Sequence, residues 1–444
     1  MSPKFRLAFR AMVLLGLVAG CLGLASEASA RVYIDITKPI SRRLPLALPA
    51  FMPMAGAAAN PVGDEGHRRL VANLTYTGLF DLLDPKGFLG KPNPAAVKYR
   101  KWSRVGAELL ITAVYRVEGD NLTLECRLFD VTEGKQLVGR RYQGRPADIK
   151  DMMLRFADAV MEALTGEPSV FGTQIAFVAA RQGAKGVTKE IAVMNFDGSG
   201  VRIITRRNDL SLYPAWSPDG KLIAYTAYRN RRPVIYIQAL AGGTGRVAVN
   251  HPGVNLTPAF KPGGGLAVAM SHTGKTNIFL TDLSGHISKQ LTNGWGIEVN
   301  PTFSPDGNKM AFVSDRGGNP QIYVLDLTSG RVTRLTYGYK YAASPAWSPR
   351  GDRIAFQLEV NGVFQIATIR PDGGDLKILT RGLSPSEDPS WSPDGRLIAY
   401  AGRQSGRYQI YVITAAGELI KRLTSLPGDN TDPAWSPRGA ALKR

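Results

Sequence analysis

The residues best suited to acid–base or metal chemistry do not gather into a recognisable site in this sequence of 444 residues. The four histidines are scattered without the short spacing that zinc ligands show; they are His67, His251, His272 and His286. No G-x-S-x-G nucleophile elbow occurs. We therefore expect each histidine to be exposed or singly hydrogen-bonded, and we expect no hydrolase of that type.

Three aspartates recur at equivalent places, in the sequence Ser-Pro-Asp-Gly, and a periodic set of carboxylates could bind a metal or act in catalysis. They are Asp219, Asp306 and Asp394. Turn geometry explains them as well, because proline fixes φ, aspartate tolerates turn conformations and glycine accepts a positive φ. Arg350 and Arg438 occupy the same position in other copies. We therefore assign these aspartates a structural role in hairpin turns.

These turns belong to a repeat whose copies begin with proline and carry a tryptophan or phenylalanine two residues later. The copies start at Pro214, Pro258, Pro301, Pro345, Pro389 and Pro433, in steps of 44, 43, 44, 44 and 44 residues. Each copy is followed by three more short, alternating segments; the last of these ends in a Leu-Thr pair such as Leu335-Thr336. Four short strands every 44 residues are typical of a β-propeller blade. Dense glycine and proline exclude a helical solenoid.

The two ends of the repeat region are complementary. A copy of the second strand, Gln174–Val178, precedes any copy of the proline-aromatic strand, and almost nothing follows the last such strand at Pro433. We expect Pro433–Ser436 to become the inner strand of one blade. The other three strands of that blade lie near Gln174, Glu190 and Arg202. This arrangement gives six complete blades over residues 173–444 and leaves no open edge at the closure.

Residues 1–30 read as a secretory signal peptide: basic residues precede the apolar run Ala11–Leu24, and the small-residue site predicts cleavage between Ala30 and Arg31. Without a twin arginine, the general secretion route is favoured. Lipoprotein processing at Cys21 is the alternative that stays open. If Cys21 leaves with the signal peptide, Cys126 is the remaining cysteine and no intramolecular disulfide can form.

Residues 31–167 lack the repeat and predict a small domain of helices and strands, joined to the propeller by a linker at 168–172. Prolines in Pro45–Pro61 predict an interruption of regular structure there. The expected elements are a strand at Arg31–Ile36, helices at Asp64–Gly78 and Ala147–Leu164, and strands at Leu109–Tyr115, Leu122–Phe129 and Gln136–Tyr142. The predicted fold class is therefore an α+β N-terminal domain followed by an all-β six-bladed β-propeller.

The formal net charge is +19, and it falls to about +17 without the signal peptide's three basic residues and one acidic residue. A basic chain raises a nucleic-acid hypothesis, but secretion and the lack of basic runs with interleaved aromatics argue against that partner. Attraction to acidic protein surfaces or to anionic envelope components is the better interpretation.

The loops that precede each proline-aromatic strand should cluster at one end of the propeller channel, which we call the mouth. These loops vary most between copies and are polar and aromatic, as protein-binding surfaces are. Any single loop can also be explained as a tolerated connection without a binding role. Together, as a ring, the loops are a candidate interface. The candidate residues are Tyr213, Asn255, Thr257, Trp295, Glu298, Asn300, Tyr341, Ser344, Glu387, Asp388, Thr431 and Asp432.

With these features the chain resembles the TolB family of the Gram-negative Tol-Pal envelope system. The resemblance covers essentially the whole chain after residue 30. It rests on the signal peptide, the junction Thr165-Gly166-Glu167-Pro168 leading into Phe171–Phe177, the six blades and the ending at Pro433–Pro437. The stretch Phe51–Pro61 and the turn at Phe260–Gly264 depart from the family pattern.

The resemblance implies a periplasmic, non-enzymatic adaptor that supports outer-membrane integrity and constriction during cell division. It implies that the lipoprotein Pal binds at the mouth and that the TolA C-terminal domain contacts the mature N-terminal segment, with other outer-membrane lipoproteins as further partners. That segment is Arg31, Val32, Tyr33, Ile34, Asp35, Ile36 and Thr37. From its residues alone it fits either addition to a partner's sheet edge or a strand of its own domain.

We expect a monomer without cofactor and leave open whether the channel holds an ion. The alternative function, from another class, is a secreted six-bladed propeller enzyme or small-ligand binder whose site lies in the channel. A metal or hydrolytic activity that maps to channel residues would favour it.

Overall fold

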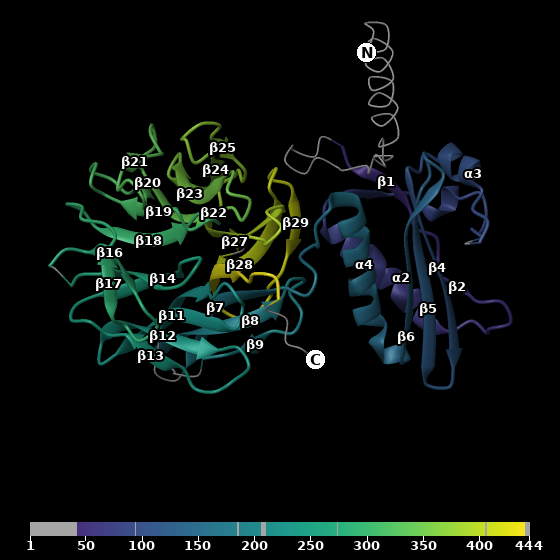
Figure 1. The fold of residues 1–444 in the computed structure, drawn as a ribbon, viewed down its shortest axis with the longest axis horizontal. Helices are drawn as coiled ribbons and strands as arrows, with labels where there is room; N and C mark the ends of the chain where they lie inside the picture. Colours follow the sequence, from purple (N-terminus) through teal and green to yellow (C-terminus); the bar gives the residue numbers. More distant parts are fainter. Residues whose placement is uncertain are drawn as a thin grey trace, which may run out of the picture.

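The computed structural model describes residues 42–93, 95–183, 186–205, 210–272, 274–404 and 406–439, which form two domains side by side (Figure 1). The predicted signal peptide, its cleavage site at Ala30 and Arg31, the alternative site at Cys21 and the segment Arg31–Thr37 lie outside these ranges. No helix within them has both the length and the apolar character that a bilayer crossing needs.

The N-terminal domain is a mixed sheet with two long helices against one face. The strand order is β3-β1-β4-β5-β6, with β2 also beside β4. The elements in chain order are β1 (Leu44–Ala47), β2 (Met52–Pro53), α2 (Pro61–Tyr76), β3 (Phe80–Leu82), η1 (Pro85–Gly87), α3 (Tyr99–Arg104), β4 (Leu109–Glu118), β5 (Asn121–Asp130), β6 (Lys135–Gly144), η2 (Pro146–Asp148) and α4 (Ile149–Thr165).

The two predicted helices and the three predicted strands after residue 108 are confirmed, with shifted ends. α2 begins three residues earlier than expected, because the Asn60 side chain caps it by accepting a hydrogen bond from the Val62 amide at 3.0 Å. α4 buries Phe156 and Val160 on the predicted apolar face. It ends at Gly166, whose φ of 75° suits a left-handed cap.

The prediction that Pro45–Pro61 contains no regular element is wrong. β1 overlaps the start of that stretch and runs between β3 and β4, parallel to both, and β2 lies within it, beside β4. Pro45 cannot donate to the ladder, but its carbonyl accepts from the Glu108 amide at 3.0 Å. Leu46 and Ala47 are completely buried, and their burial offsets the missing hydrogen bond.

The repeat region forms six four-stranded antiparallel sheets around a channel, which confirms the six-bladed propeller. The blades are β10 (Ser211–Trp216), β11 (Leu222–Arg229), β12 (Arg232–Ala239), β13 (Arg246–Val249); β14 (Asn255–Phe260), β15 (Leu266–Met270), β16 (Asn277–Thr281), β17 (Ile287–Gln290); β18 (Glu298–Phe303), β19 (Lys309–Ser314), β20 (Gln321–Asp326), β21 (Val332–Arg334); β22 (Ala342–Trp347), β23 (Ile354–Val360), β24 (Val363–Ile369), β25 (Lys377–Ile378); β26 (Ser386–Trp391), β27 (Leu397–Gln404), β28 (Arg407–Thr414), β29 (Leu419–Arg422); and β30 (Asn430–Trp435), β7 (Gln174–Gly183), β8 (Gly186–Asn195), β9 (Arg202–Ile203).

The fourth strands end earlier than the Leu-Thr pairs suggested. In β21 the strand stops at Arg334, and Leu335 donates its amide to the Ile322 carbonyl at 2.8 Å. Thr336 then turns inward, and its Oγ1 accepts from the Ile322 amide at 3.0 Å. The repeated threonine thus replaces a backbone acceptor where the ladder ends. Thr292, Thr380 and Thr424 do the same in other blades.

The closure of the ring is as predicted. β30 pairs antiparallel with β7, with Thr431 opposite Val178 and Trp435 opposite Ile175. The Ser436 amide donates to the Gln174 carbonyl at 2.8 Å, and Trp435 Nε1 donates to Thr173 Oγ1 at 2.9 Å. The two ends of the repeat region therefore share one blade.

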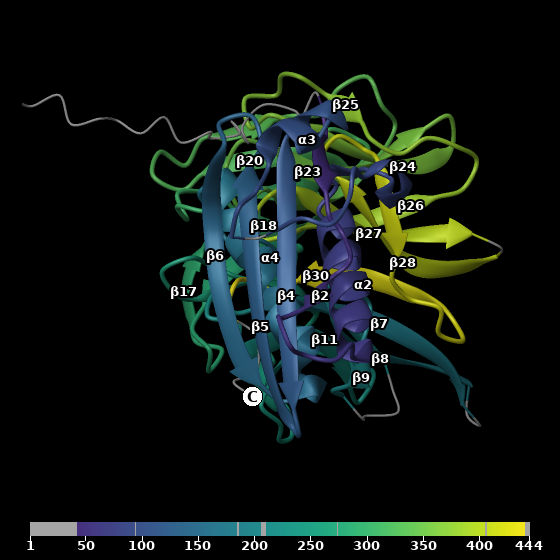
Figure 2. The ribbon, with the colours of Figure 1, turned by 90° about the vertical axis from the view of Figure 1, so that its right-hand side faces the viewer.

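The N-terminal domain covers the end of the ring opposite the mouth. Strands of a blade alternate in direction, so the turns after its first and third strands lie away from the loops that enter the inner strand. The domain packs on these turns: Tyr76 donates its hydroxyl to the Phe196 carbonyl at 2.6 Å, and Arg43 pairs with Glu418 at 2.8 Å. Figure 2 looks from this side, with the N-terminal sheet in front of the ring. α2 and α4 lie between that sheet and the propeller (Figure 1).

Candidate functional site

A ring of strained residues lines the inner strands. In every copy the residue before the proline has a left-handed backbone, with φ between 47° and 53°, and the strand register shifts there. We call these six residues the channel ring: Tyr213, Thr257, Asn300, Ser344, Asp388 and Asp432. Tyrosine and β-branched threonine rarely adopt this conformation, which costs about 1–3 kcal/mol per residue. Such strain persists where the surrounding structure holds it, and functional sites are where it concentrates.

The members of the channel ring interact across blades. Ser344 donates its hydroxyl to Asp388 Oδ1 at 2.8 Å, and the Asn300 amide donates to Thr257 Oγ1 at 3.1 Å. Burial, and then the charges of Asp432 and Asp388, raise the pKa of Tyr213 to about 12. The six candidate residues at this position therefore do converge on one site.

Two carboxyl groups of the ring are neighbours. Burial, followed by the charge of Asp432, raises the pKa of Asp388. Burial also raises the pKa of Asp432, against a hydrogen bond from Thr431 Oγ1 at 2.8 Å. Both residues are half-buried, and neighbouring carboxylates shielded from water resist ionising together, so this side of the channel retains a proton more readily than exposed aspartates do.

Exposed apolar side chains gather on three successive mouth loops, those leading into β18, β22 and β26. Trp295 is 87% exposed and Leu383 is 95% exposed; Ile297 and Tyr337 are also exposed. Cations cover two of the rings: Lys275 Nζ lies 4.5 Å from the Trp295 ring centroid, and the Arg334 guanidinium lies 4.7 Å from that of Tyr337. We call Trp295, Ile297, Tyr337 and Leu383 the apolar arc. The sequence interpretation missed Tyr337 and Leu383, although both lie just outside the loops it singled out.

Two candidates outside the channel ring are completely buried. Glu298 is completely buried, pairs with Arg316, and accepts from the Gly294 amide at 3.3 Å. It thereby holds the loop that carries Trp295. Asn255 is also completely buried and donates to the His251 carbonyl at 2.9 Å. The expectation that these two residues lie on the mouth surface is wrong, because the first position of an inner strand points into the blade.

The remaining candidates lie at or near the surface of the mouth. Tyr341 is partly exposed and packs edge-on against Phe364, with ring centroids 5.3 Å apart. Glu387 accepts the Tyr408 hydroxyl at 2.7 Å. Thr431 holds Asp432 through the hydrogen bond described above. These three side chains shape the rim beside the channel ring.

The predicted structural roles of the repeated aspartates are confirmed. Asp394 Oδ1 accepts from Ser392 Oγ at 2.5 Å and from the Arg396 amide at 3.2 Å; Asp219 and Asp306 make the equivalent bonds. In the copy with Arg350, Asp352 takes over and accepts from Ser348 Oγ at 2.8 Å.

Two of the scattered histidines meet in space, since the rings of His251 and His272 lie 5.3 Å apart. Each of His251 and His67 bonds one backbone carbonyl. Across the ranges that the structure describes, no three His, Cys, Asp or Glu side chains are grouped so that they could hold a metal ion.

Comparison with known proteins agrees with this architecture. Residues 161–440 match the family model of the TolB β-propeller domain, and residues 32–137 match that of the TolB amino-terminal domain. The crystal structure of TolB from Acinetobacter baumannii superposes with a TM-score of 0.77 at 28% identity, covering 89% of this chain and 97% of that one.

Curated relatives are similar over a shorter span. The "Tol-Pal system protein TolB" of Desulfosudis oleivorans is 40% identical over 60% of this chain and 61% of its own length. The "Protein TolB homolog" of Chlorobium chlorochromatii is 38% identical over 64% of each. The chain therefore spans less than two thirds of the length of these relatives. With both domains matched by family models, and the propeller model alone covering more than half of the chain, the chain belongs to the TolB family.

Proposed function

We propose that this chain is a non-enzymatic periplasmic adaptor that binds the lipoprotein Pal at the propeller mouth and works without a cofactor. The observation that carries the proposal is the apolar arc on three neighbouring loops, next to a ring of strained residues. Exposed tryptophan, tyrosine and leucine on a rigid scaffold are what a protein interface uses as anchors.

The mouth and the N-terminal domain lie at opposite ends of the ring, so one partner at each end would not collide. We propose that the TolA C-terminal domain binds the segment Arg31–Thr37, whose alternating residues suit addition to a sheet edge. Two partners held on one rigid body would link the Tol components to an outer-membrane lipoprotein. In this role the chain, exported with its signal peptide and cleaved after Ala30, would support envelope integrity and constriction during division.

The test is a calorimetric titration of the mature protein with purified Pal. Trp295→Ala should weaken binding by about 2 kcal/mol or more, which is roughly thirtyfold, as expected for a central aromatic anchor. Leu383→Ala should also weaken binding. The matched control is Leu419→Ala, because Leu419 is 60% exposed but lies on β29, away from the mouth.

Circular dichroism must show that each variant keeps its fold. If the Leu383 and Leu419 variants bind Pal with equal affinity, the apolar arc is not part of the interface. Absence of binding by the folded parent would refute the Pal proposal altogether.

A further inference from the structure

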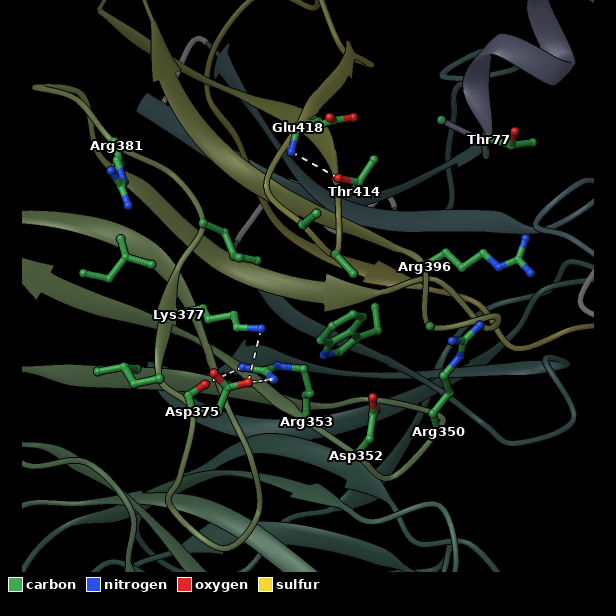
Figure 3. A pocket seen from close by; sticks show the side chains of 18 of the residues that line it. Thr77, Arg350, Asp352, Arg353, Asp375, Lys377, Arg381, Arg396, Thr414 and Glu418 are labelled. Carbon is green, nitrogen blue, oxygen red and sulfur yellow. Dashed lines mark hydrogen bonds and ion pairs between the residues drawn. The ribbon is translucent and has the colours of Figure 1, made fainter. Parts of the chain in front are cut away.

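A cavity of about 830 Å³ lies between the two domains, on the side of the propeller away from the mouth. Its walls come from the start of the described chain, the end of α2 and the turns of the blades β22–β25 and β26–β29 (Figure 3). Leu379 and Trp391 supply apolar surface. None of the four apolar-arc residues lines the cavity, although Tyr339 and Arg381 of the loops leading into β22 and β26 reach it.

The cavity lining is strongly cationic. Seven arginine and lysine side chains line it against three carboxylates. The carboxylates already have partners: Glu418 pairs with Arg43, Asp375 with Arg353 and Lys377, and Asp352 accepts the Ser348 hydroxyl. The formal charge of the lining is therefore +4, and one of its cations, Arg42, also pairs with Glu108 outside the cavity.

Two of these cations are held side by side at one end of the cavity, as Figure 3 shows for Arg350 and Arg396. Arg350 donates its Nε to the Asp394 carbonyl at 2.8 Å and lies against Gly395, where an added Cβ would come within 3.0 Å of the Arg350 side chain. This contact fixes the position of the Arg350 stem. Two like charges held near each other repel, and a shared anion would reduce that repulsion.

The Arg396 side chain has buried hydrogen-bond donors that an anion could satisfy. Its Nε and Nη2 atoms are buried and find no hydrogen-bond acceptor within the described part of the chain. Burial lowers the pKa of Arg396, and the adjacent Arg350 lowers it further while Asp394 opposes the effect. A buried donor without an acceptor costs free energy that a bound oxyanion would recover.

We propose that this inter-domain cavity binds a phosphate-bearing anion, with Arg350 and Arg396 as its paired ligands. Guanidinium groups match phosphate oxygens with two parallel hydrogen bonds, and a doubly charged phosphate matches a pair of cations better than a single carboxylate does. Lys377 and Arg381, further along the lining, extend the positive field over the opening. The phosphate can come from a soluble phosphate ester or from the headgroup of an anionic phospholipid, and the experiment separates the two.

The first arm titrates the mature protein with inorganic pyrophosphate and with glycerol 3-phosphate in low-salt buffer, by calorimetry and by thermal shift. The parent should bind and gain thermal stability. Arg396→Gln and Arg350→Gln should each weaken binding at least tenfold, and Arg396→Lys should lose less because it keeps the charge. The control is Arg100→Gln, an exposed arginine on α3 outside the cavity, which should bind like the parent.

The second arm sediments the protein with vesicles of phosphatidylcholine, with and without phosphatidylglycerol. Binding to the anionic vesicles that Arg396→Gln abolishes and pyrophosphate competes away would assign the site to a lipid headgroup. Binding in the first arm only would assign it to a soluble phosphate ester. The proposal is overturned if the folded parent binds neither probe, if Arg396→Gln binds like the parent, or if Arg100→Gln loses as much as Arg396→Gln.

Discussion

Replacing Trp435 by alanine tests how far the propeller depends on its closing strand. The indole is buried, and its Nε1 donates to Thr173 at 2.9 Å, which links β30 to the start of the propeller. Removing a buried tryptophan costs about 3–5 kcal/mol, and loss of the hydrogen bond adds about 1 kcal/mol. β30 is joined to β7 by non-covalent contacts, so this loss lowers the free energy of opening the ring.

Hydrogen exchange measured by mass spectrometry reads that opening directly. A combined loss of about 4–6 kcal/mol should speed exchange of the β7 amides by about three to four orders of magnitude, at about 1.4 kcal/mol per factor of ten. Trp347→Ala is the matched control, because Trp347 is the equivalent buried residue of a blade whose four strands follow one another in the chain. Its effect should stay within β22 and β23.

Full protection of the β7 amides in Trp435→Ala would refute the prediction. Equal acceleration of β7 exchange in both variants would refute it as well, since the closing strand would then have no special position.

Two further predictions concern the contact between the domains. Burial raises the pKa of Asp158 from 3.8 to about 6, so the folded chain holds this proton more tightly than the unfolded chain does. The free energy of unfolding, measured by urea denaturation, should therefore include a contribution that is present below pH 4 and is lost towards pH 6, by at most about 3 kcal/mol. Asp158→Asn should lack that loss. An unchanged pH profile in the variant would contradict the assignment. Tyr76→Phe should cost about 1–3 kcal/mol in the same assay because it leaves the buried Phe196 carbonyl without its donor; a loss below 0.5 kcal/mol would show that water replaces the hydroxyl.

Much of the propeller could be predicted because one local pattern, proline, aromatic and turn, repeats at a constant period. The N-terminal sheet could be predicted only in part. β1 contains Pro45, and proline argues against a central strand; its burial between β3 and β4 depends on tertiary contacts that no local pattern encodes. Glu298 shows the same limit at the site, since a glutamate in a polar loop gives no sign that its partner Arg316 lies 18 residues away in sequence and buries it.

The cationic cavity could not be anticipated from sequence either. Arg350 and Arg396 lie in different blades, 46 residues apart, and each occupies an ordinary turn position of the repeat. Their juxtaposition follows from the way two neighbouring blades and the N-terminal domain meet, and the unmatched donors on Arg396 become visible only when burial is known.

The shared blade at the ring closure also has a mechanical consequence. A pull between a partner at the mouth and one on the N-terminal domain would travel through residues 168–173 into β7, which lies directly beside β30. Tension would then run along these two antiparallel strands. Their cross-strand hydrogen bonds would all resist the sliding of one strand past the other, instead of breaking one after another. The antiparallel pairing of β7 with β30 would therefore resist such a pull in shear, the direction in which paired strands hold best.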